Sequence, residues 1–223
     1  MMYYLAGVTA RQGKKTIVTT TTHILQPVDG SYAKTETEYQ SLWEEHRYAV
    51  IGKCTSEGKL KCPDDGLLNL ACAQADIVFI EADGAKHFPL KVPKETEPVI
   101  IPQSDIVIGV VGLDSIGNTL ETVCFRKDQA VSLLQTKEKH IITEEDIVKI
   151  LSSEKGTKKY ITKQEYYVVL NKCDDDECLE SAGKIAKLLE RQGILKVAAT
   201  RFEKQNGQER NSYGRIYTYK SKR

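Results

Sequence analysis

Apolar runs alternate with amphipathic stretches along this chain, and the alternation predicts an α/β fold. Runs rich in β-branched and aliphatic residues are typical of strands and lie at 16–20, 49–52, 77–80, 106–111, 166–170 and 194–199. Stretches with helical periodicity lie at 3–12, 42–47, 64–75, 143–151 and 175–192. Because the runs 77–80 and 106–111 are apolar throughout, they are expected to be parallel strands covered on both faces. This order predicts a doubly wound, mostly parallel sheet in a three-layer arrangement with helices.

Local signals mark the ends of some of these elements. Gly13 follows the first predicted helix, as a glycine that ends a helix does. Thr143 is the predicted N-cap of the helix over 143–151, with Asp146 in the third helical position. Residues 29–40 are polar and predicted as a loop, and the prolines in and next to 81–97 predict an irregular loop there.

The composition argues against a nucleic-acid-binding surface, a membrane protein and a disulfide-bonded secreted protein. The chain has 32 lysines and arginines against 31 acidic residues, a net charge of +1, which excludes a surface built broadly for nucleic acid. No apolar run reaches the ~20 residues that a membrane helix needs. The six cysteines lack CxxC spacing, and the first residues, MMYYLAGVTARQGKK, have too short an apolar stretch for the signal peptide of a secreted protein, so we expect reduced thiols. The sequence predicts a cytoplasmic protein with neither a membrane nor a nucleic acid as partner.

Charge distinguishes the end of the chain from the rest. Residues 200–223 carry a net charge of +5 and residues 1–199 a net charge of −4. We therefore predict one α/β domain over 1–199 and a basic C-terminal segment over 200–223. That segment either contacts an acidic partner or nucleic acid, or is a solvated terminus.

In a doubly wound sheet, ligands bind beyond the carboxyl ends of the strands, so the polar residues there are candidates for chemistry. The run Thr19–His23 ends the first predicted strand. Its hydroxyls, at Thr21 and Thr22, can ligate Mg²⁺ or bind phosphate oxygens, and His23 can move a proton. The alternative is that these threonines only favour the strand and that His23 is a loop residue.

The second candidate is Glu81-Ala82-Asp83-Gly84, which follows the apolar strand at 77–80. Carboxylates at such a strand end hold Mg²⁺ or its water shell in nucleotide-hydrolysing folds, and Gly84 permits close approach to a phosphate. Lys86 and Lys91 supply positive charge downstream. The alternative is an ordinary Asp-Gly turn.

The third candidate is Asn171-Lys172-Cys173-Asp174, which leaves the strand at 166–170. Asn-Lys-x-Asp after a strand is the guanine-reading element of GTP-binding proteins. Its aspartate accepts hydrogen bonds from the base, its lysine packs along the ring and its asparagine ties loops together. The alternative is an acidic helix start favoured by the helix dipole, with Asp175 or Asp176 as the cap.

A phosphate-binding loop of the form GxxxxGK[ST] is absent from the sequence. The segments Gly7 to Lys14 and Gly52 to Lys59 come close, but each has five residues between its glycines and neither has the final Ser or Thr. Neither is predicted to join a strand to a helix.

The segments TTTTH, EADGAKHFPLKVP, EPVIIP, IGVVGLD and LNKCD, in this order, resemble the YqeC-type family, proposed accessory proteins for selenium-dependent molybdenum hydroxylases. The resemblance runs from about Tyr3 to Ala199, and Lys86, Lys91 and Arg126 match further family positions. It implies a P-loop NTPase-like, nucleotide-binding domain that takes Mg²⁺ and GTP or ATP. It also implies a molybdenum hydroxylase, or the proteins that mature its cofactor, as a partner.

The beginning of the sequence departs from this family. Members normally start with a strand and a loop like GAGGKTT, whereas this sequence begins MMYYLAGVTARQGKK, which matches the following helix. We expect Met1 to come directly after the P-loop, with about 15 residues missing before it. A misassigned start codon is the expected cause, and a natural truncation is the alternative. Loss of that strand should leave a gap in the sheet or bring its neighbours together. Loss of the loop removes the main phosphate anchor, so this chain could fail to bind the nucleotide.

Three functions fit these features. The first is a Mg²⁺-dependent GTP-binding accessory protein. In this protein Thr22 and Asp83 would bind the metal, and Glu81, Asp83 and His23 would be the catalytic residues. The nucleotide-binding residues are then Thr21, Thr22, Gly84, Asn171, Lys172 and Asp174. The second is a small-molecule kinase or ATP-dependent ligase, with Lys86, Lys91 and Arg126 binding an anionic substrate or phosphate. The third is a non-catalytic scaffold that binds a partner.

Overall fold

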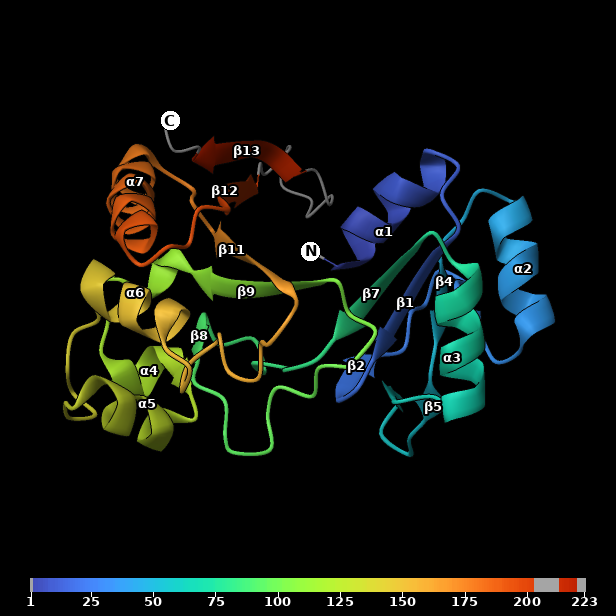
Figure 1. The fold of residues 1–223 in the computed structure, drawn as a ribbon, viewed down its shortest axis with the longest axis horizontal. Coiled ribbons are helices and arrows are strands. Elements are labelled where there is room, and N and C mark those ends of the chain that lie inside the picture. The colour runs from blue at the N-terminus through green and yellow to red at the C-terminus, as the bar shows by residue number, and fades with distance from the viewer. Residues whose placement is uncertain (1, 203–212, 220–223) are drawn as a thin grey trace. The chain divides into compact units, whose positions relative to one another are not determined.

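The computed structural model describes residues 2–202 and 213–219, with the backbone alone for 202 and 213–217, and divides the chain into two compact units, Met1–Gly84 and Ala85–Arg223 (Figure 1). Unit 1 contains α1 (Met2–Arg11), β1 (Thr16–Thr20), β2 (His23–Leu25), β3 (Tyr32–Ala33), α2 (Glu36–Glu44), β4 (Ala49–Ile51), β5 (Lys53–Cys54), β6 (Lys59–Lys61), α3 (Asp65–Gln74) and β7 (Ile77–Glu81). Unit 2 contains β8 (Leu90–Lys91), β9 (Ile106–Gly112), the 3₁₀ turn η1 (Leu113–Ser115), α4 (Leu120–Val123), β10 (Cys124–Phe125), α5 (Lys127–Leu134), α6 (Glu144–Ser152), β11 (Glu165–Asn171), α7 (Asp176–Arg191), β12 (Val197–Phe202) and β13 (Tyr213–Tyr219).

Unit 1 is built on a four-stranded parallel sheet with the order β3-β4-β1-β7. Adjacent residues of β1 point to opposite faces. Ile17 packs with buried residues of α2 and α3, and Val18 packs with Ala6 of α1 and Leu60 of β6. Both faces of β1 are therefore covered, as expected for an apolar parallel strand. A small antiparallel sheet with the order β2-β6-β5 completes the unit.

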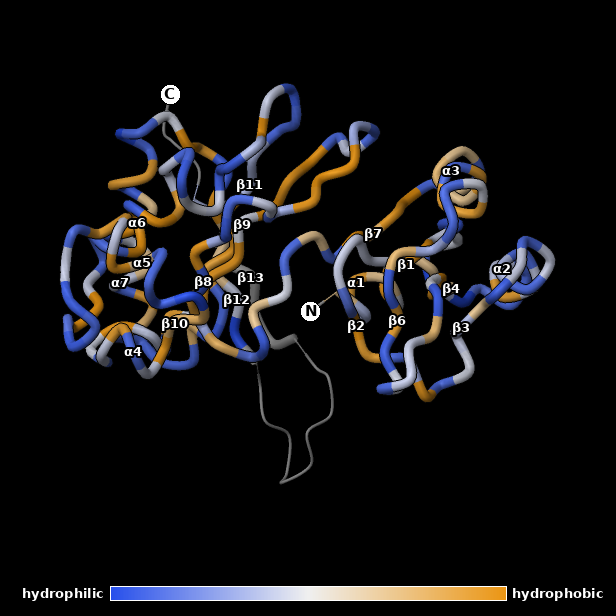
Figure 2. The backbone as a smooth tube through the Cα atoms, turned by 90° about the horizontal axis from the view of Figure 1, so that it is seen from below, coloured by the Kyte–Doolittle hydropathy of each residue, from blue (hydrophilic) through white to orange (hydrophobic). Residues whose placement is uncertain are grey.

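Unit 2 is built on a four-stranded sheet with the order β13-β12-β11-β9, in which β9, β11 and β12 are parallel and β13 is antiparallel. One face carries the core, where Leu170 of β11 packs with Ile147 of α6 and Ile185 of α7. On the opposite face, alternate residues of β9 remain exposed: Ile106 by 48%, Ile108 by 44% and Val110 by 40%. The prediction that this strand is covered on both faces is therefore wrong. Figure 2 shows the hydrophobic run along β9 and that along β7.

Local capping signals are confirmed where the sequence predicted them. Gly13 has a φ of 79° directly beyond α1, a backbone conformation that glycine adopts without strain. The Thr143 side chain accepts a hydrogen bond from the Asp146 N–H and completes a capping box at α6. At α7 the Asp175 carboxylate accepts from the Cys178 N–H at 2.7 Å. The cap at Asp175 leaves Asp174 outside the helix.

Several expectations about the elements are corrected. The predicted loop over 29–40 contains β3 and the start of α2, because Thr35 caps a helix that begins at Glu36 instead of at residue 42. The predicted loop over 81–97 contains β8. The last predicted strand, over 194–199, is displaced to Val197–Phe202. The α/β class and the mostly parallel strands are confirmed, but the strands are divided among several sheets instead of one.

Two further expectations concern the ends of the chain and the membrane. The predicted boundary at residue 199 falls inside β12, which pairs with β13. Residues 203–212 and 220–223 of the basic segment lie outside the described residues, so the predicted role of that segment stays a prediction. Within the described part of the chain, no helix is both long and apolar enough to span a bilayer.

Candidate functional site

The first two candidate strand ends meet in unit 1, because β1 and β7 are parallel neighbours with Thr20 opposite Glu81. The Glu81 carbonyl accepts from the Thr20 hydroxyl at 3.0 Å and from the Thr21 N–H at 3.0 Å. The Thr22 N–H in turn donates to the Thr20 hydroxyl at 2.8 Å. These contacts hold the turn after β1 against the end of β7. The structure thus brings together Thr21, Thr22 and Glu81 as the sequence predicts.

The threonine run divides into structural and accessible hydroxyls. Thr19 is buried and donates its hydroxyl to the Ile51 carbonyl at 3.0 Å, and Thr20 is buried as well. Thr21 and Thr22 are half-buried. Only these two hydroxyls of the run are therefore placed to contact a ligand.

Asp83 and Gly84 extend from the end of β7 and are half-buried. A Cβ added at Gly84 would lie 3.7 Å from Oε1 of Glu81, so the Glu81 carboxylate lies over this turn. Thr22, Glu81 and Asp83 offer only oxygen atoms, the donors that Mg²⁺ takes in proteins. No group of three or more His, Cys, Asp or Glu side chains in the described ranges is placed to hold a metal. A Mg²⁺ ion here would therefore need oxygens from a ligand such as a phosphate.

His23 lies apart from this carboxylate pair. It is exposed, begins β2 and pairs across the small antiparallel sheet with Lys61. Its imidazole makes no hydrogen bond or ion pair with any residue that the structure describes. Its proposed role in proton transfer stays a prediction without a contact to support it.

The third candidate strand end lies in unit 2 and is held by two side-chain contacts. The Asn171 side-chain oxygen accepts from the Thr200 hydroxyl at 2.8 Å, which ties the end of β11 to β12. Lys172, with a φ of 57°, donates from Nζ to Oδ2 of Asp114 at 2.6 Å, which ties the same loop to the turn after β9. Asp174 is exposed beyond these ties. The loop is thus fixed at its first two positions and presents its aspartate outward.

Cys173, between these residues, is buried. Burial, followed by the charges of Cys178 and Asp175, raises the pKa of its thiol to about 11. The thiolate form is scarce at neutral pH, so this cysteine is a packing residue.

A cluster of positive charge surrounds Phe125 in unit 2. We call Lys86, Lys91, Arg126, Glu97 and Phe125 the Phe125 cluster. The β8–β10 pairing places Lys91 opposite Phe125. Measured to the centroid of the Phe125 ring, Arg126 Cζ lies at 4.8 Å, Lys86 Nζ at 5.2 Å and Lys91 Nζ at 5.4 Å. The structure therefore brings together the three predicted anion-binding residues around one aromatic ring.

Glu97 is the carboxylate of the Phe125 cluster. Lys91 Nζ lies 3.0 Å from Glu97 Oε2, and Arg126 Nη2 lies 3.2 Å from Glu97 Oε1. The side chains of Lys91 and Glu97 are only 7% and 13% exposed. Burial raises the pKa of the Glu97 carboxyl, but the hydrogen bond and charge of Lys91, with those of the Lys94 N–H and Arg126, hold it below its usual value.

Gly112, at the end of β9, lies between the Phe125 cluster and the Asn171 loop. Its N–H donates to the Pro89 carbonyl at 2.8 Å, next to β8. A Cβ added there would overlap with Asp114 Oδ1 and would lie 2.8 Å from the Pro89 Cβ. The absence of a side chain at Gly112 therefore lets the segment before β8 approach the turn that holds Lys172.

This close approach gives a stability prediction. Gly112→Ala is expected to lower the free energy of unfolding by about 1–3 kcal/mol, because Pro89 cannot move aside without shifting β8. Gly183→Ala, in α7, is the matched control. Its Cβ would contact only Tyr219 at 3.9 Å, and alanine favours a helix by about 0.5–1 kcal/mol over glycine. Urea denaturation of both variants measures the difference, and equal effects would contradict the crowding at Gly112.

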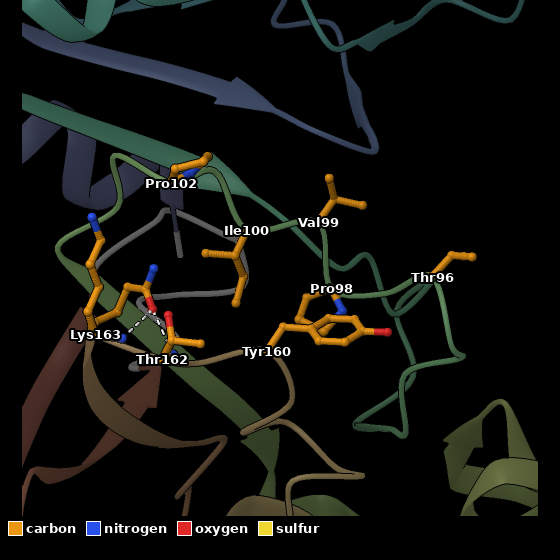
Figure 3. A pocket seen from close by; sticks show the side chains of 9 residues that line it. Thr96, Pro98, Val99, Ile100, Pro102, Tyr160, Thr162 and Lys163 are labelled. Atoms are coloured by element: carbon orange, nitrogen blue, oxygen red, sulfur yellow. Dashed lines mark hydrogen bonds between the residues drawn. The ribbon is translucent and has the colours of Figure 1, made fainter.

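A shallow cavity of about 430 Å³ lies between the loop 96–102 and the segment 160–164 of unit 2 (Figure 3). The Tyr160 ring lies beside Pro98 in Figure 3, and the Tyr160 hydroxyl donates to the Glu95 carbonyl. Among the described residues of the lining, Lys163 is the only charged one, and none is a predicted site residue. The cavity therefore shares no side chain with the candidate sites.

Comparison with known proteins decides the family. A sequence model described as YqeC protein matches residues 1–128, more than half of the chain. The chain belongs to the YqeC protein family. It is 29% identical over 131 residues to a relative from Escherichia coli (strain K12) described as "Uncharacterized protein YqeC". That match covers 55% of this chain and 50% of the relative, so the chain matches only half of the relative's length. No solved structure matches.

The family match includes all of unit 1 and the Phe125 cluster, whereas the Asn171 loop lies beyond it. In this YqeC family member, the sequence assigned no role to Glu97, Phe125, Asp114 or Thr200 as neighbours of the candidate residues, although Glu97 and Asp114 lie in the segments EPVIIP and IGVVGLD that carry the family resemblance. Phe125 stands next to the candidate Arg126 but belongs to no motif that assigns it a role. Asp114 follows a predicted strand, so the rule that placed the other candidates at strand ends could have found it.

Proposed function

We propose that this YqeC family member is a Mg²⁺-dependent guanine-nucleotide-binding protein that assists the maturation of selenium-dependent molybdenum hydroxylases. The observation that carries the nucleotide part is the Asn171 loop, held by Thr200 and Asp114 with Asp174 exposed at its end. The maturation role, and the client enzyme with it, rests on the family resemblance alone.

Guanine recognition needs a carboxylate that accepts two parallel hydrogen bonds, from N1–H and from the exocyclic amine. Asp174 is a candidate because Asp175, and not Asp174, caps α7. The Lys172–Asp114 pair positions the lysine stem ahead of it. A base bound in this way is distinguished from adenine, which lacks both donors in that arrangement. This supports GTP over ATP as the nucleotide.

The Mg²⁺ part of the proposal rests on unit 1. Thr22, Glu81 and Asp83 form an all-oxygen donor set at the ends of β1 and β7, and Thr20 fixes the backbone of both ends. A bound Mg²⁺ would neutralise phosphate charge there. Catalysis of this class consists mostly of positioning and charge stabilisation, so the loss of one carboxylate should be decisive.

Asp83→Asn is therefore expected to abolish Mg²⁺-dependent GTP hydrolysis and to weaken Mg²⁺-dependent GTP binding at least about tenfold, a loss of roughly 1.4 kcal/mol. The matched control is Glu44→Gln, which removes an exposed acid on α2. Malachite-green phosphate release and calorimetry with and without EDTA measure both effects. Unchanged hydrolysis in Asp83→Asn would contradict the assignment of the metal site.

The Phe125 cluster favours a second candidate function, a small-molecule kinase or ATP-dependent ligase, because it offers charge for an anionic substrate. Transfer and hydrolysis differ in the fate of the terminal phosphate. Incubation with γ-³²P-labelled GTP or ATP and candidate acceptors separates them. Label on an organic product supports a kinase, and label only in inorganic phosphate supports hydrolysis.

A further inference from the structure

The charge of the Phe125 cluster is not balanced within the cluster. Lys86, Lys91 and Arg126 contribute three positive charges, and Glu97 contributes one negative charge. Lys86 is exposed and has no hydrogen bond or ion pair with any described residue, only its contact with the Phe125 ring. The cluster therefore keeps a net charge of +2 with an accessible ammonium group.

Arg126 has donors that the protein leaves unused. Nη2 bonds to Glu97, whereas Nε is buried without a partner and Nη1 bonds to no described residue. Buried donors of this kind are uncommon in folded proteins and call for an explanation such as a ligand. The guanidinium fork suits phosphate or carboxylate oxygens.

Backbone strain is also concentrated around the Phe125 ring. Arg126 has a φ of 70°, Lys86 one of 49° and His87 one of 68°, all in the left-handed region that favours glycine. Such residues cost about 1 kcal/mol or more each and are retained where the surrounding structure or a function requires them. Two of the three cations of the cluster, Arg126 and Lys86, are therefore held on left-handed backbone.

We propose that the Phe125 cluster is a binding site for a phosphate dianion carried by a small molecule. Two negative charges match the net +2 of the cluster, whereas a single carboxylate would leave it positive. Arg126 would bind two phosphate oxygens through Nη1 and the second hydrogen of Nη2, and the exposed Lys86 would add a third contact. Lys91, held by Glu97, adds positive charge beside the same ring. The proposal does not depend on guanine recognition by Asp174.

Binding of inorganic phosphate to the full chain, followed by ³¹P NMR line broadening, tests the site. Lys86→Ala is expected to weaken binding at least about fivefold, and Arg126→Asn to abolish it. Asparagine tolerates the left-handed backbone, so the fold should persist. Lys155→Ala, which removes an exposed lysine of unit 2, is the control and should bind as the wild type does.

Glu97→Gln is the most decisive variant, because binding and a purely structural role predict different changes in phosphate affinity. It removes the competing negative charge while keeping the shape of the side chain, so phosphate should bind more tightly, whereas a purely structural cluster predicts no gain. Absence of phosphate binding in the wild type, or equal losses in Lys86→Ala and Lys155→Ala, would overturn the site.

Competition identifies the source of the phosphate. If the site takes the phosphates of a nucleotide, GTP displaces inorganic phosphate and Lys86→Ala weakens GTP binding. If it takes a separate phosphorylated substrate, the two bind together. Failure of guanine recognition alone would appear as equal binding of GTP and ATP with phosphate binding intact, so the two proposals fail in distinguishable ways.

Discussion

Asp174→Asn is expected to exchange the base preference of this protein, from guanosine to xanthosine nucleotides. The carboxylate accepts from N1–H and from the amine of guanine, whereas the asparagine amide can donate to the carbonyl that replaces this amine in xanthine. A bidentate pair of this kind is worth about 1–3 kcal/mol of discrimination, or about 10- to 100-fold in affinity. Competition of GTP and XTP against a fluorescent guanine nucleotide measures the exchange.

The control for this exchange is Asp176→Asn, the same substitution two residues further along. Asp176 is exposed in the first turn of α7, where its carboxylate serves the helix and not the base. It should leave the GTP to XTP ratio unchanged. Unaltered base preference in Asp174→Asn would show that Asp174 does not read the base. Loss of preference in both variants would show that the substitutions act by disturbing the fold of the loop.

The second large effect is expected at Glu97. Glu97→Ala removes the carboxylate that Lys91 and Arg126 share, and Lys91 is almost fully buried. Removal of one partner of a buried pair costs about 3–5 kcal/mol, because the other charge stays buried. Chemical denaturation should therefore show a large loss of stability. Glu95→Ala, an exposed acid in the same loop, is the control and should change stability by less than about 0.5 kcal/mol.

Two further measurements show whether Glu97→Ala loses stability through the broken ion pair or through lost packing. The double variant Lys91→Met with Glu97→Leu should lose less stability than Glu97→Ala alone, since it leaves no unpaired charge at the buried Lys91 position, and Arg126, with a side chain 32% exposed, keeps contact with water. The folded state also lowers the pKa of Glu97 from its ordinary value of 4.5, so its stabilisation is complete above that pH and is lost as the pH falls through the lowered value. Glu97→Ala should then show a shallower loss of stability in acid. A slope equal to the wild type would contradict this pair.

Local signals carried most of the fold that the sequence could predict. Thr143 with Asp146, Asp175 and Gly13 each act within a few residues, so their caps and turns follow from the sequence alone. The strand ends at Thr20 and Glu81 meet because parallel neighbours share a carboxyl edge. The exposed face of β9 could not be predicted, because an apolar run does not say which neighbour covers it.

The Phe125 cluster shows why part of the candidate site stayed hidden. The sequence named Lys86, Lys91 and Arg126 but not what gathers them. Their assembly depends on the short β8–β10 pair and on Glu97, which is remote in sequence from Arg126. Contacts of this kind follow from the tertiary fold and leave no periodic pattern or motif.

Calorimetric titration of the full chain with GTP, ATP and guanosine, each with Mg²⁺ and with EDTA, shows whether this YqeC family member binds guanine nucleotides together with Mg²⁺. We expect GTP with Mg²⁺ to bind at least about tenfold more tightly than ATP with Mg²⁺, and EDTA to weaken GTP binding. Equal affinity for GTP and ATP, or no binding of either, would rule out guanine-nucleotide recognition by this protein.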